Sequence, residues 1–572
     1  MQSWPERFPE RLEYELACFA DRGLDFEVDQ DLLDRHGRVV LRGSIIHRGE
    51  VIELEVVYPD LFPWMRPEVY AKDLRLERHQ NPYQGNLCLL DRSSRSWKPS
   101  YPAAWLVGEK VPYLLELLAS SEEAMKRAES PQGEPFSSYF IGTPGTTVIV
   151  PSAMLELPID ARAGAGRIAV APFEGPGVWI RGAIAELVEK RGSRKTRTLA
   201  TTEDTLKRRF AGAEIPFRWV RLAELPTENS AAALLATIEA TQHGFGTPRW
   251  ETVAGGAVTI VAAVFKEEVR QGEYEDTWLF VVRIRTEAGV SDPYLVRGER
   301  LSRFDLEARL PTNMRLGERC IALAGLGALG GELAIELAKA GVGRLRGLDF
   351  DTVEAGTTVR WPAGLTTVGR LKTGYLNERI QVDYPYTTFE PVLMQIGGSA
   401  RGGSEGASEL DILDAFIAEA DLLIDATAEI GVQQALAAMA ADRGVPAIFV
   451  SATEGARGGL VARIDPAAGG CWMCLQLALE AGDIPVPAHA EPLTLQPRGC
   501  SDLTYSGAGF DLLPVSAQAA RVAAATLTPG AASSGSIVFV CSLAEDNLAP
   551  PQWSSHPLSS RPDCPICEEH LG

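Results

Sequence analysis

The segment around a glycine-rich turn at residues 325–331 constrains the fold more than any other part of this chain. A short apolar run, residues 320–324, precedes the turn and is typical of a buried strand. Residues 332–340 favour a helix, and residues 345–348 predict a second strand that ends in acidic residues. Strand, glycine turn, helix, strand and acid, in this order, are the layout of a nucleotide-binding βαβ unit.

Three glycines of the turn, Gly325, Gly327 and Gly330, allow the backbone to approach a phosphate group, to which the helix N-terminus offers its N–H groups. Asp349 and Asp351 lie about 20 residues further on, where a carboxylate suits ribose hydroxyls. The pattern alone predicts a site for a dinucleotide or for ATP and does not distinguish them. The alternative is a doubly wound domain that binds no ligand.

A chain of 572 residues is too long for one hydrophobic core, so we expect about three or four domains. The formal net charge of −21 argues against nucleic acid and membrane as partners, because both favour a basic surface. The sequence has no apolar run of about 18 residues and no signal-peptide core, so we expect a cytoplasmic protein. Nine cysteines then favour metal ligands, catalytic thiols or core residues over disulfides.

The first part of the chain, residues 1–130, has the order helix, strand meander, proline-rich loop, cysteine segment, helix, which predicts an α+β domain. Residues 10–20 favour an amphipathic helix, and residues 39–47 and 51–58 favour strands. Cys88 lies in the extended segment that follows.

Cys88 has two interpretations. A cysteine between two leucines is often a buried structural residue, because cysteine is among the most buried residue types. Polar neighbours favour a reactive thiol instead: His79, Asn81, Asn86 and Asp91. The amide of Asn81 is a candidate donor to the oxyanion that forms when a thioester is attacked.

The middle part, residues 131–305, begins with a stretch rich in serine, proline and glycine that is typical of a linker. Strands are predicted at residues 147–150, 167–170, 258–264 and 278–284. Helices are predicted at residues 182–190 and 230–240. Because this part of the sequence has no glycine loop, metal cluster or nucleophile constellation, we expect a rigid spacer or docking domain.

The last part, residues 306–572, continues the nucleotide-binding unit. Arg360 and Lys372 lie downstream of the glycine turn, and two fixed cations suit the charge of a triphosphate better than a neutral nicotinamide. Residues 420–426 predict another buried strand, with Asp425 at the carboxyl end, where open α/β sheets bind their ligands.

Two C-x-x-C pairs, Cys471 with Cys474 and Cys564 with Cys567, are the sharpest signal in the chain. Together they predict a closed Cys₄ structural zinc site. The pairs lie far apart in sequence, so the metal would join the end of the chain to the rest of its domain. A redox-active pair is the alternative, and His570 is a spare ligand.

Cys500 lies between these pairs, in a polar loop that precedes an alanine-rich helix. A helix N-terminus or a cation such as Arg498 near this cysteine would favour the reactive thiolate. Cys500 is therefore a candidate nucleophile. The remaining cysteines lie in apolar strand-like runs or in a helix, and we assign them to the core: Cys18, Cys320 and Cys541.

The first part of the chain resembles the ubiquitin-conjugating (E2) family. The resemblance rests on these motifs: Tyr58-Pro59, Pro63, Pro67, His79-Gln80-Asn81, Cys88, Trp97 and Pro99. The chain departs from the family at Gln80, where the family has proline, and the spacing from Asn81 to the cysteine is one residue shorter. The resemblance implies that Cys88 is an acceptor thiol for an acyl group.

Residues 306–572 resemble the ThiF/MoeB-type adenylating fold of ubiquitin-activating (E1) enzymes. The motifs are residues 325–331, 349–354, Arg360, Lys372, the triplet that begins at Asp425, both cysteine pairs and the sequence SAQAAR. The resemblance implies that Asp349 holds the ribose of ATP and that Arg360 and Lys372 hold its phosphates. It also implies that Cys500 takes the activated protein as a thioester.

The chain departs from this second family at two positions. The family's asparagine is Thr357 here, and the acid that usually positions magnesium is Ala428, followed by Glu429. We therefore expect Asp425, Glu429 or another group to hold Mg²⁺. An arginine that reaches ATP from the N-terminal side in the family has two candidates: Arg303 and Arg309.

With both resemblances in one polypeptide, the chain is similar to bacterial E1–E2 fusion proteins of antiviral operons, notably the CBASS-associated ones. The resemblances imply an N-terminal UBC-like α+β domain, a central mixed α/β linker domain and a C-terminal Rossmann-like adenylation domain with a zinc site. They also imply ATP, Mg²⁺ and Zn²⁺ as cofactors and a homodimer through the adenylation domain.

The activated substrate would be the C-terminus of a ubiquitin-like protein or of a cGAS-like nucleotidyltransferase, and the acceptor an amine on a target protein. Two other classes stay open. One is a ThiF-like activator of a sulfur carrier in which Cys88 is inert, and the other is a non-catalytic scaffold.

Overall fold

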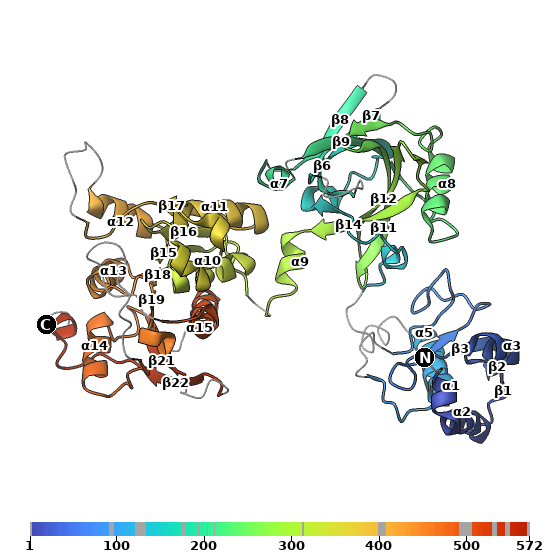
Figure 1. The fold of residues 1–572 in the computed structure, drawn as a ribbon, viewed down its shortest axis with the longest axis horizontal. Helices are drawn as coiled ribbons and strands as arrows, with labels where there is room; N and C mark the ends of the chain where they lie inside the picture. Colours follow the sequence, from blue (N-terminus) through green and yellow to red (C-terminus); the bar gives the residue numbers. More distant parts are fainter. Residues whose placement is uncertain are drawn as a thin grey trace. The chain divides into compact units, whose positions relative to one another are not determined.

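The computed structural model (Figure 1) describes residues 3–568 with these gaps: 91–95, 121–132, 173–178, 192–194, 203, 211, 312–313, 399–407, 491–505, 529–534 and 544–548. The chain divides into two compact units. The first consists of Met1–Thr202 and Phe210–Arg300, and the second of Glu203–Arg209 and Leu301–Gly572.

The first unit begins with a four-stranded antiparallel sheet in the order β1-β2-β3-β4. Its strands are β1 (Phe26–Val28), β2 (Val40–His47), β3 (Glu50–Val57) and β4 (Glu68–Tyr70). The helices are α1 (Trp4–Arg7), α2 (Pro9–Asp21), α3 (Gln30–His36), α4 (Ala103–Trp105), a π-helical turn (Leu106–Lys110) and α5 (Val111–Leu118). Helix α2 and strands β2 and β3 lie where the sequence predicts them, and α3 is additional.

Alternation in β3 explains how this sheet packs. Ile52, Leu54 and Val56 are buried, whereas Glu53 and Glu55 between them are not. Successive side chains of a strand point to opposite faces, so the apolar face of β3 covers the core and its acidic face stays in water. The same core contains side chains of α2 and of the π-helical turn, as expected for an α+β fold.

The second sheet of this unit closes on itself. Its strands are β5 (Thr147–Pro151), β6 (Ala163–Val170), β7 (Arg181–Arg191), β8 (Lys195–Thr201), β9 (Ala213–Arg221), β10 (Glu251–Val253), β11 (Gly256–Arg270), β12 (Glu273–Thr286), β13 (Gly289–Val290) and β14 (Tyr294–Leu301). The path runs from β11 through β9, β6, β7, β5 and β14 to β12, and β12 pairs with β11 again. Four buried aromatic side chains belong to the core of this closed sheet: Phe217, Trp219, Trp278 and Phe280. Helix α8 (Ala231–Thr241) packs on a second core cluster, as the sequence predicts.

The prediction of a helix at residues 182–190 is wrong, because these residues belong to β7. Alanine, glutamate, leucine and lysine give this segment its high helix propensity. Strands β6 and β8 pair with β7 along most of its length, and β5 pairs with its first residues. Propensity differs between residues by only a few tenths of a kcal/mol, so this pairing and the burial of Ile184 and Leu187 decide the structure.

The second unit is built on an eight-stranded sheet in the order β17-β16-β15-β18-β19-β20-β21-β22. Its strands are β15 (Cys320–Ala324), β16 (Arg344–Leu348), β17 (Thr388–Val392), β18 (Leu422–Asp425), β19 (Ala447–Ala452), β20 (Gly458–Ile464), β21 (Ile537–Ser542) and β22 (Gln552–Pro557). The five strands from β17 to β19 are parallel, and the rest are antiparallel. Every residue of β15 is buried, as expected for a strand covered on both faces.

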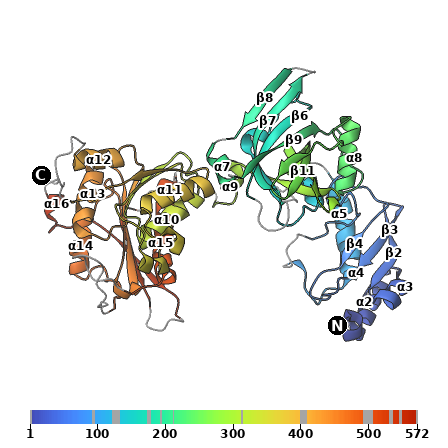
Figure 2. The same ribbon diagram turned by 45° about the horizontal axis from the view of Figure 1, so that its top comes forward.

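Helices cover both faces of this sheet (Figure 2). On one face lie α10 (Ala328–Lys339), α11 (Lys372–Asp383) and α15 (Gly509–Leu527). On the other lie α12 (Glu409–Ile417), α13 (Ile430–Asp442) and α14 (Trp472–Glu480). The described part of the unit also has three short α-helices: α7 (Asp204–Arg209), which contacts α11, α9 (Arg303–Glu307) and α16 (Pro565–Glu568). The βαβ unit that the glycine turn predicts is thus present, with parallel β15 and β16 joined by α10.

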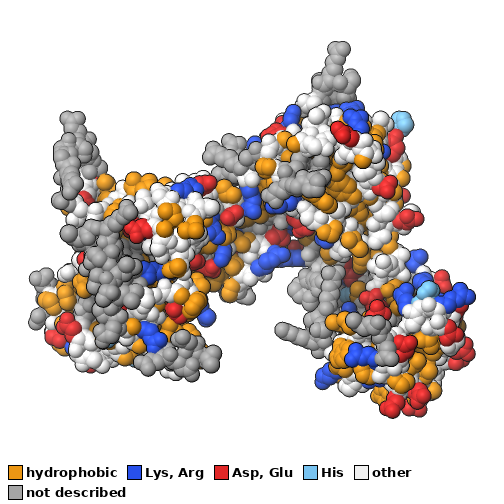
Figure 3. Space-filling view, in the orientation of Figure 1, with side chains coloured by type: hydrophobic (Ala, Val, Ile, Leu, Met, Phe, Trp, Pro, Cys, Tyr) orange, Lys and Arg blue, Asp and Glu red, His pale blue; other side chains and the backbone are white. Residues whose placement is uncertain are grey.

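Charged side chains of both signs are interspersed over the face drawn in Figure 3. Within the part of the chain that the structure describes, no helix combines the length and the hydrophobicity that crossing a bilayer requires. Cys18, Cys320 and Cys541 are buried, which confirms their assignment to the core.

Candidate functional site

The glycine turn folds against the loop that follows β18. Gly325 has φ +80°, and a Cβ atom there would lie 2.7 Å from the carbonyl carbon of Ala426. A Cβ atom at Gly330 would lie 1.8 Å from the carbonyl oxygen of Gly325. Both positions therefore require glycine. At Gly327, which precedes α10, a Cβ atom would have no neighbour within 4 Å, so the turn is open on that side.

Asp349 connects the glycine turn to the end of β16. Its Oδ2 accepts a hydrogen bond from the Leu326 N–H at 2.7 Å, and its Oδ1 accepts one from the Asp351 N–H at 2.8 Å. Lys372 Nζ lies 2.8 Å from Asp351 Oδ2 and 3.9 Å from Asp349 Oδ2. The structure therefore brings the turn, both acids and the lysine into one cluster, as the sequence predicts.

Asp425 is fully buried at the carboxyl end of β18. Its Oδ1 accepts hydrogen bonds from the N–H and the Oγ1 hydroxyl of Thr427, at 2.8 and 2.7 Å. Its Oδ2 is buried and has no hydrogen-bond partner among the described residues. Burial raises the pKa of this carboxyl to about 6. A buried oxygen without a hydrogen-bond partner lowers the stability of the fold, so this oxygen is suited to bind a cation or to accept a hydrogen bond from a ligand.

The position of the family's magnesium-binding acid is an exposed alanine. Ala428 has φ +59°, a conformation that a residue other than glycine rarely adopts. Glu429 next to it is also exposed, and its N–H donates to Thr427 Oγ1 at 3.3 Å. Of the two acids proposed to hold magnesium, only Asp425 is buried beside the glycine turn.

The predicted arginines differ in their surroundings. Arg360 follows a 3₁₀ turn (Ala355–Val359), is half-buried and donates its N–H to the Thr357 carbonyl at 3.0 Å. Arg303 donates to the carbonyls of Gly341 and Tyr386 at 3.1 and 3.0 Å, which ties its guanidinium to the fold. The Arg309 guanidinium donates to the carbonyl of Asp305. None of these bonds involves the glycine turn.

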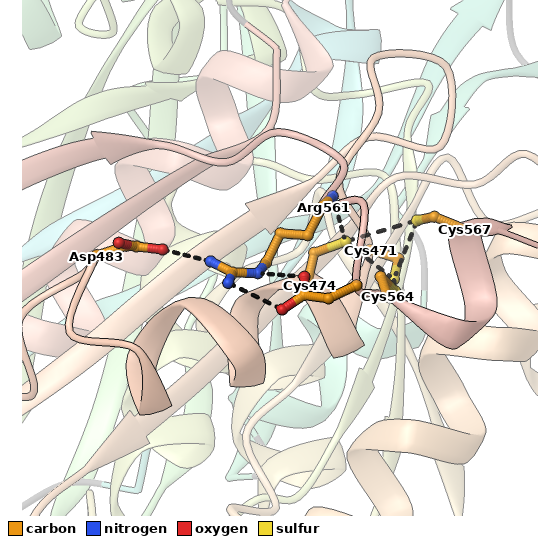
Figure 4. Close-up of polar contacts among 7 residues, drawn as sticks. Cys471, Cys474, Asp483, Arg561, Cys564 and Cys567 are labelled. Atoms are coloured by element: carbon orange, nitrogen blue, oxygen red, sulfur yellow. Dashed lines mark hydrogen bonds and ion pairs between the residues drawn. The ribbon is translucent and has the colours of Figure 1, made fainter.

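The four cysteines of the two C-x-x-C pairs form one cluster, with all their sulfur atoms within 4.8 Å of one another (Figure 4). Cys471 Sγ lies 3.7 Å from Cys474 Sγ, 3.5 Å from Cys564 Sγ and 3.6 Å from Cys567 Sγ. A tetrahedral zinc ion with Zn–S bonds of about 2.3 Å requires sulfur–sulfur distances of about 3.8 Å. The cluster is therefore able to hold a metal ion.

The sequence around this cluster positions its ligands. Cys471 is the N-cap of α14 and Cys474 lies in its first turn, so one helix end presents two thiols. The Arg561 N–H donates to Cys474 Sγ at 3.4 Å, and the Arg561 side chain bridges Asp483 and Asp563 (Figure 4). Arg561 thereby joins the segment of the second pair to the loop after α14.

Cys88 is exposed in the first unit, which excludes the alternative of a buried structural cysteine. Its N–H donates to the His79 carbonyl at 2.7 Å. Asn81 Oδ1 accepts from the N–H groups of Tyr83 and Gln84, at 3.0 and 3.2 Å, so this oxygen stabilises a turn. Among the described residues the Asn81 Nδ2 group has no hydrogen-bond partner.

Two buried polar residues of the first unit have roles that sequence reasoning missed. Gln80 donates from Nε2 to the carbonyls of Ala71 and Leu74, at 2.8 and 3.0 Å, so its amide fixes this loop. Glu15 accepts from the Tyr58 hydroxyl at 3.0 Å and from the Ala103 N–H at 2.7 Å. Burial raises the pKa of the Glu15 carboxyl. The motif Tyr58-Pro59 was the sequence signal that could have indicated a hydrogen-bond partner, here Glu15, for the Tyr58 hydroxyl.

Cys500 lies outside the described residues, as do Asp91, Arg498 and His570. The residues on either side of the segment 491–505 are described, and both contact the same turn. The Ala490 N–H donates to the Glu454 carbonyl at 2.9 Å. A Cβ atom at Gly507 would lie 2.8 Å from Ala456 Cβ. Ala490 and Gly507 therefore contact one turn, and Gly507 lies just before α15.

Residues 305–508 match the ThiF family. The second unit, with its parallel sheet, its glycine turn and the cluster of acids and lysine, therefore contains a ThiF-family domain. Over nearly its whole length the chain is also similar to two proteins of Sinorhizobium fredii (strain NBRC 101917 / NGR234).

The chain is 31% identical to the protein y4oA over 594 residues, which cover 98% of this chain and 97% of y4oA. It is 30% identical to y4qC over 552 residues, 91% of this chain and 90% of y4qC. The chain belongs to the family of y4oA and y4qC.

Similar solved structures include Escherichia coli MccB with ATP, at a TM-score of 0.33 and 14% identity over 44% of this chain and 67% of MccB. The structure of PaaA is similar at a TM-score of 0.30 and 16% identity, over 44% of this chain and 69% of PaaA.

Proposed function

We propose that this protein activates the C-terminus of a partner protein with ATP and transfers it, through two thioesters, to an amine of a target. The observation that carries the proposal is the presence, in one chain, of an E1-like adenylating domain and of an exposed cysteine in a separate α+β fold. The cysteine follows the motif His79-Gln80-Asn81, which resembles that of conjugating enzymes.

The first step is adenylation. The partner's carboxylate attacks the α-phosphorus of ATP, and pyrophosphate leaves. Lys372 and Arg360 neutralise the charge of the triphosphate, and Asp349 accepts hydrogen bonds from the ribose. Both oxygens of Asp349 already accept one backbone hydrogen bond, and each retains a second lone pair for this purpose.

The residues present also fit a magnesium ion. Asp425 Oδ2 is the buried oxygen without a partner among the described residues, and it belongs to a residue at the carboxyl end of the sheet. A bound Mg²⁺ would neutralise phosphate charge, and Asp425 is the residue that we assign to hold it. Four thiolates at the Cys₄ cluster suit zinc, which has no role in the reaction and fixes the end of the chain.

The later steps are acyl transfers. The sulfur of Cys500 attacks the acyl-adenylate carbonyl and AMP leaves, which replaces one slow step with faster ones. The sulfur of Cys88 then attacks this thioester and the Cys500 thiolate leaves. Finally the target amine attacks the carbonyl of the Cys88 thioester, an amide bond forms and the Cys88 thiolate leaves. The Asn81 Nδ2 group is our candidate donor to the oxyanion of this last step.

The cellular role that we propose is conjugation in a bacterial defence system. The resemblance to CBASS-associated fusion proteins supports a ubiquitin-like protein or a cGAS-like nucleotidyltransferase as the activated partner. It also supports a cytoplasmic homodimer that forms through the adenylating domains.

The test combines pyrophosphate exchange with non-reducing gels. The full chain is incubated with ATP and with the product of a neighbouring gene. We expect ATP-dependent, thiol-sensitive adducts on Cys500 and Cys88, and Cys88→Ala should retain the adduct on Cys500 alone. Cys541→Ala, which changes a buried thiol of β21, is the matched control and should retain both adducts. Exchange without any Cys88 adduct would favour a sulfur-carrier activator, and no exchange at all would favour a scaffold.

A further inference from the structure

Cys88 lies opposite His79 in a short antiparallel ladder. The Cys88 N–H donates to the His79 carbonyl at 2.7 Å, and the Asn81 N–H donates to the Asn86 carbonyl at 2.9 Å. These two bonds flank the pair Gln80 and Leu87. The next pair in this register is His79 with Cys88, and opposed residues of such a ladder have Cα atoms about 5.5 Å apart.

The side chains of this pair lie away from the core. Gln80 and Leu87 are buried, with 5% and 7% of their surface exposed. Side chains alternate in an extended segment, so Cys88, the neighbour of Leu87, belongs to the outer face, and its backbone hydrogen bond to the His79 carbonyl places the two residues side by side. Cys88 is exposed, and the His79 side chain retains 24% of its surface. An imidazole and a thiol therefore share one accessible face of the first unit.

Glu134 holds His79 in place. Its two carboxylate oxygens accept the His79 N–H at 2.7 and 2.9 Å, and Oε1 also lies 3.0 Å from His79 Nδ1. His79 has φ +61°, which is unfavourable for a residue with a side chain, and the carboxylate stabilises this conformation. With Nδ1–H donated to Glu134, the basic nitrogen of the neutral imidazole is Nε2.

The closed sheet in turn holds Glu134. The Glu134 N–H donates to Glu268 Oε2 at 3.1 Å, and Arg78 donates to the same oxygen at 2.6 Å. Gly133 packs so tightly that a Cβ atom there would lie 2.6 Å from the Glu268 carbonyl oxygen. Glu268 belongs to β11. Among the described residues, Glu134 therefore contacts His79 directly, and Glu268 and Arg78 lie behind Glu134.

We propose that His79 accepts the proton of the Cys88 thiol and that Glu134 is the positioning residue that orients the imidazole for this transfer. As Cys88 attacks the Cys500 thioester, its S–H bond breaks and the proton moves to His79 Nε2. The new S–C bond forms and the Cys500 thiolate leaves. Glu134 stabilises the resulting imidazolium. This inference rests on the proposed function of Cys88 as an acyl acceptor, and it gives the closed sheet a part in the chemistry.

Alkylation of Cys88 in the full chain tests the proposal without ATP or partner. Iodoacetamide is applied between pH 5.5 and 9.5, and the carbamidomethylated Cys88 peptide is quantified by mass spectrometry. We expect His79→Gln to raise the pH of half-maximal alkylation by about one unit and to lower the rate at pH 7 about threefold, because a more basic thiolate is also more nucleophilic. Glu134→Gln should shift the profile in the same direction by less.

His243→Gln is the matched control. His243 belongs to the same unit and forms the same contact, from Nδ1 to Glu239 Oε1 at 2.9 Å, but it is fully exposed. Its substitution should leave the Cys88 profile unchanged. A wild-type profile in His79→Gln would overturn the proposal, and a wild-type profile in Glu134→Gln alone would overturn the role of Glu134. A wild-type far-UV circular dichroism spectrum of His79→Gln would show that the variant is folded. A smaller shift of the same sign in Glu134→Gln would show that the effect is chemical and not the result of misfolding.

Alkylation is independent of the relay, so the two hypotheses fail separately. A shifted profile in His79→Gln without any ATP-dependent adduct on Cys88 would reject the proposed function and retain the proton transfer. Adducts on both cysteines, together with a wild-type alkylation profile in His79→Gln, would support the proposed function and reject the proton transfer.

Discussion

Lys372 belongs to the cluster at the glycine turn, with its Nζ 2.8 Å from Asp351 Oδ2 and 3.9 Å from Asp349 Oδ2. We expect Lys372→Met to lower the rate of ATP–pyrophosphate exchange about 100-fold, because the loss of one fixed donor to a developing charge typically has an effect of this size. The measurement is exchange of labelled pyrophosphate into ATP by the full chain.

Lys339 provides the control for this substitution. It lies at the end of α10 and pairs with Glu336 at 2.6 Å on the surface. Lys339→Met removes the same charge at a distance from the turn and should leave exchange within about twofold, since isolated surface pairs contribute little. An equal loss in both variants would show that net charge, rather than a phosphate contact, determines the rate.

Asp425 makes stability dependent on pH. Its pKa is about 6 in the folded chain, against an ordinary value of 3.8. Between these values the folded state holds the proton and the unfolded state has released it, so the free energy of unfolding decreases as pH rises from about 4 to about 6, by up to about 3 kcal/mol. Asp425→Asn should remove this decrease, measured as Tm against pH without nucleotide or metal.

Asp442→Asn is the control, because Asp442 is an exposed carboxylate at the end of α13. Its variant should show the same dependence on pH as the natural chain. If Asp425→Asn also retained the dependence, the buried carboxyl would not be the group that titrates.

Individual site residues were predictable where chemistry fixes their type. The four cysteines, the turn glycines and Asp349 have residue types that few others replace, and the structure brings each set together. Gln80 and Glu15 were not predictable in the same way, since their roles arise from burial beside segments distant in sequence. Pattern and spacing describe local structure, whereas these two contacts depend on the tertiary fold.

At the scale of elements, the glycine-rich segment from the end of β15 into the first turn of α10 tolerates no side chain at Gly325 or Gly330. Gly330→Ala would place a methyl group 1.8 Å from a carbonyl oxygen of the same turn. We expect it to destabilise the second unit by about 3 kcal/mol and to abolish pyrophosphate exchange. Thermal unfolding and exchange are measured on the same sample.

Gly356→Ala is the matched variant, since no atom lies within 4 Å of a Cβ at that position. It should change stability by less than about 0.5 kcal/mol. If both variants had the same free energy of unfolding, the segment around Gly330 would be able to accommodate a methyl group, which would contradict this prediction.

Strands β15 and β18 of the second unit were predictable because parallel strands that are buried on both faces have continuous apolar sequences. The first unit contains the one helix that was predicted wrongly. Strand β7 has a helix-favouring composition, and only its neighbours in the closed sheet make it a strand. Closure of that sheet also depends on pairings between strands that are distant in sequence, such as β5 with β14, which no local pattern indicates.

At the scale of the whole chain, a metal ion at the Cys₄ cluster should stabilise the second unit and leave the stability of the first unit unchanged. All four cysteines lie in the second unit, and they join residues 93 apart in sequence, such as Cys471 and Cys564. We expect about one zinc per chain, because four thiolates in a tetrahedral arrangement favour this metal. Metal content is measured by elemental analysis of the purified full chain.

Removal of this metal should lower the stability of the second unit alone. Cys564→Ser leaves three thiolates, and a loss of about 3 kcal/mol would lower the Tm of a unit of this size by about 6–12 °C. Calorimetry of the full chain should therefore show one transition that moves and one that does not. Cys320→Ser changes a cysteine of the same unit outside the cluster and should retain the zinc. A displacement of both transitions by Cys564→Ser would mean that the metal stabilises both units, because a purely local metal site affects only the unit that contains it.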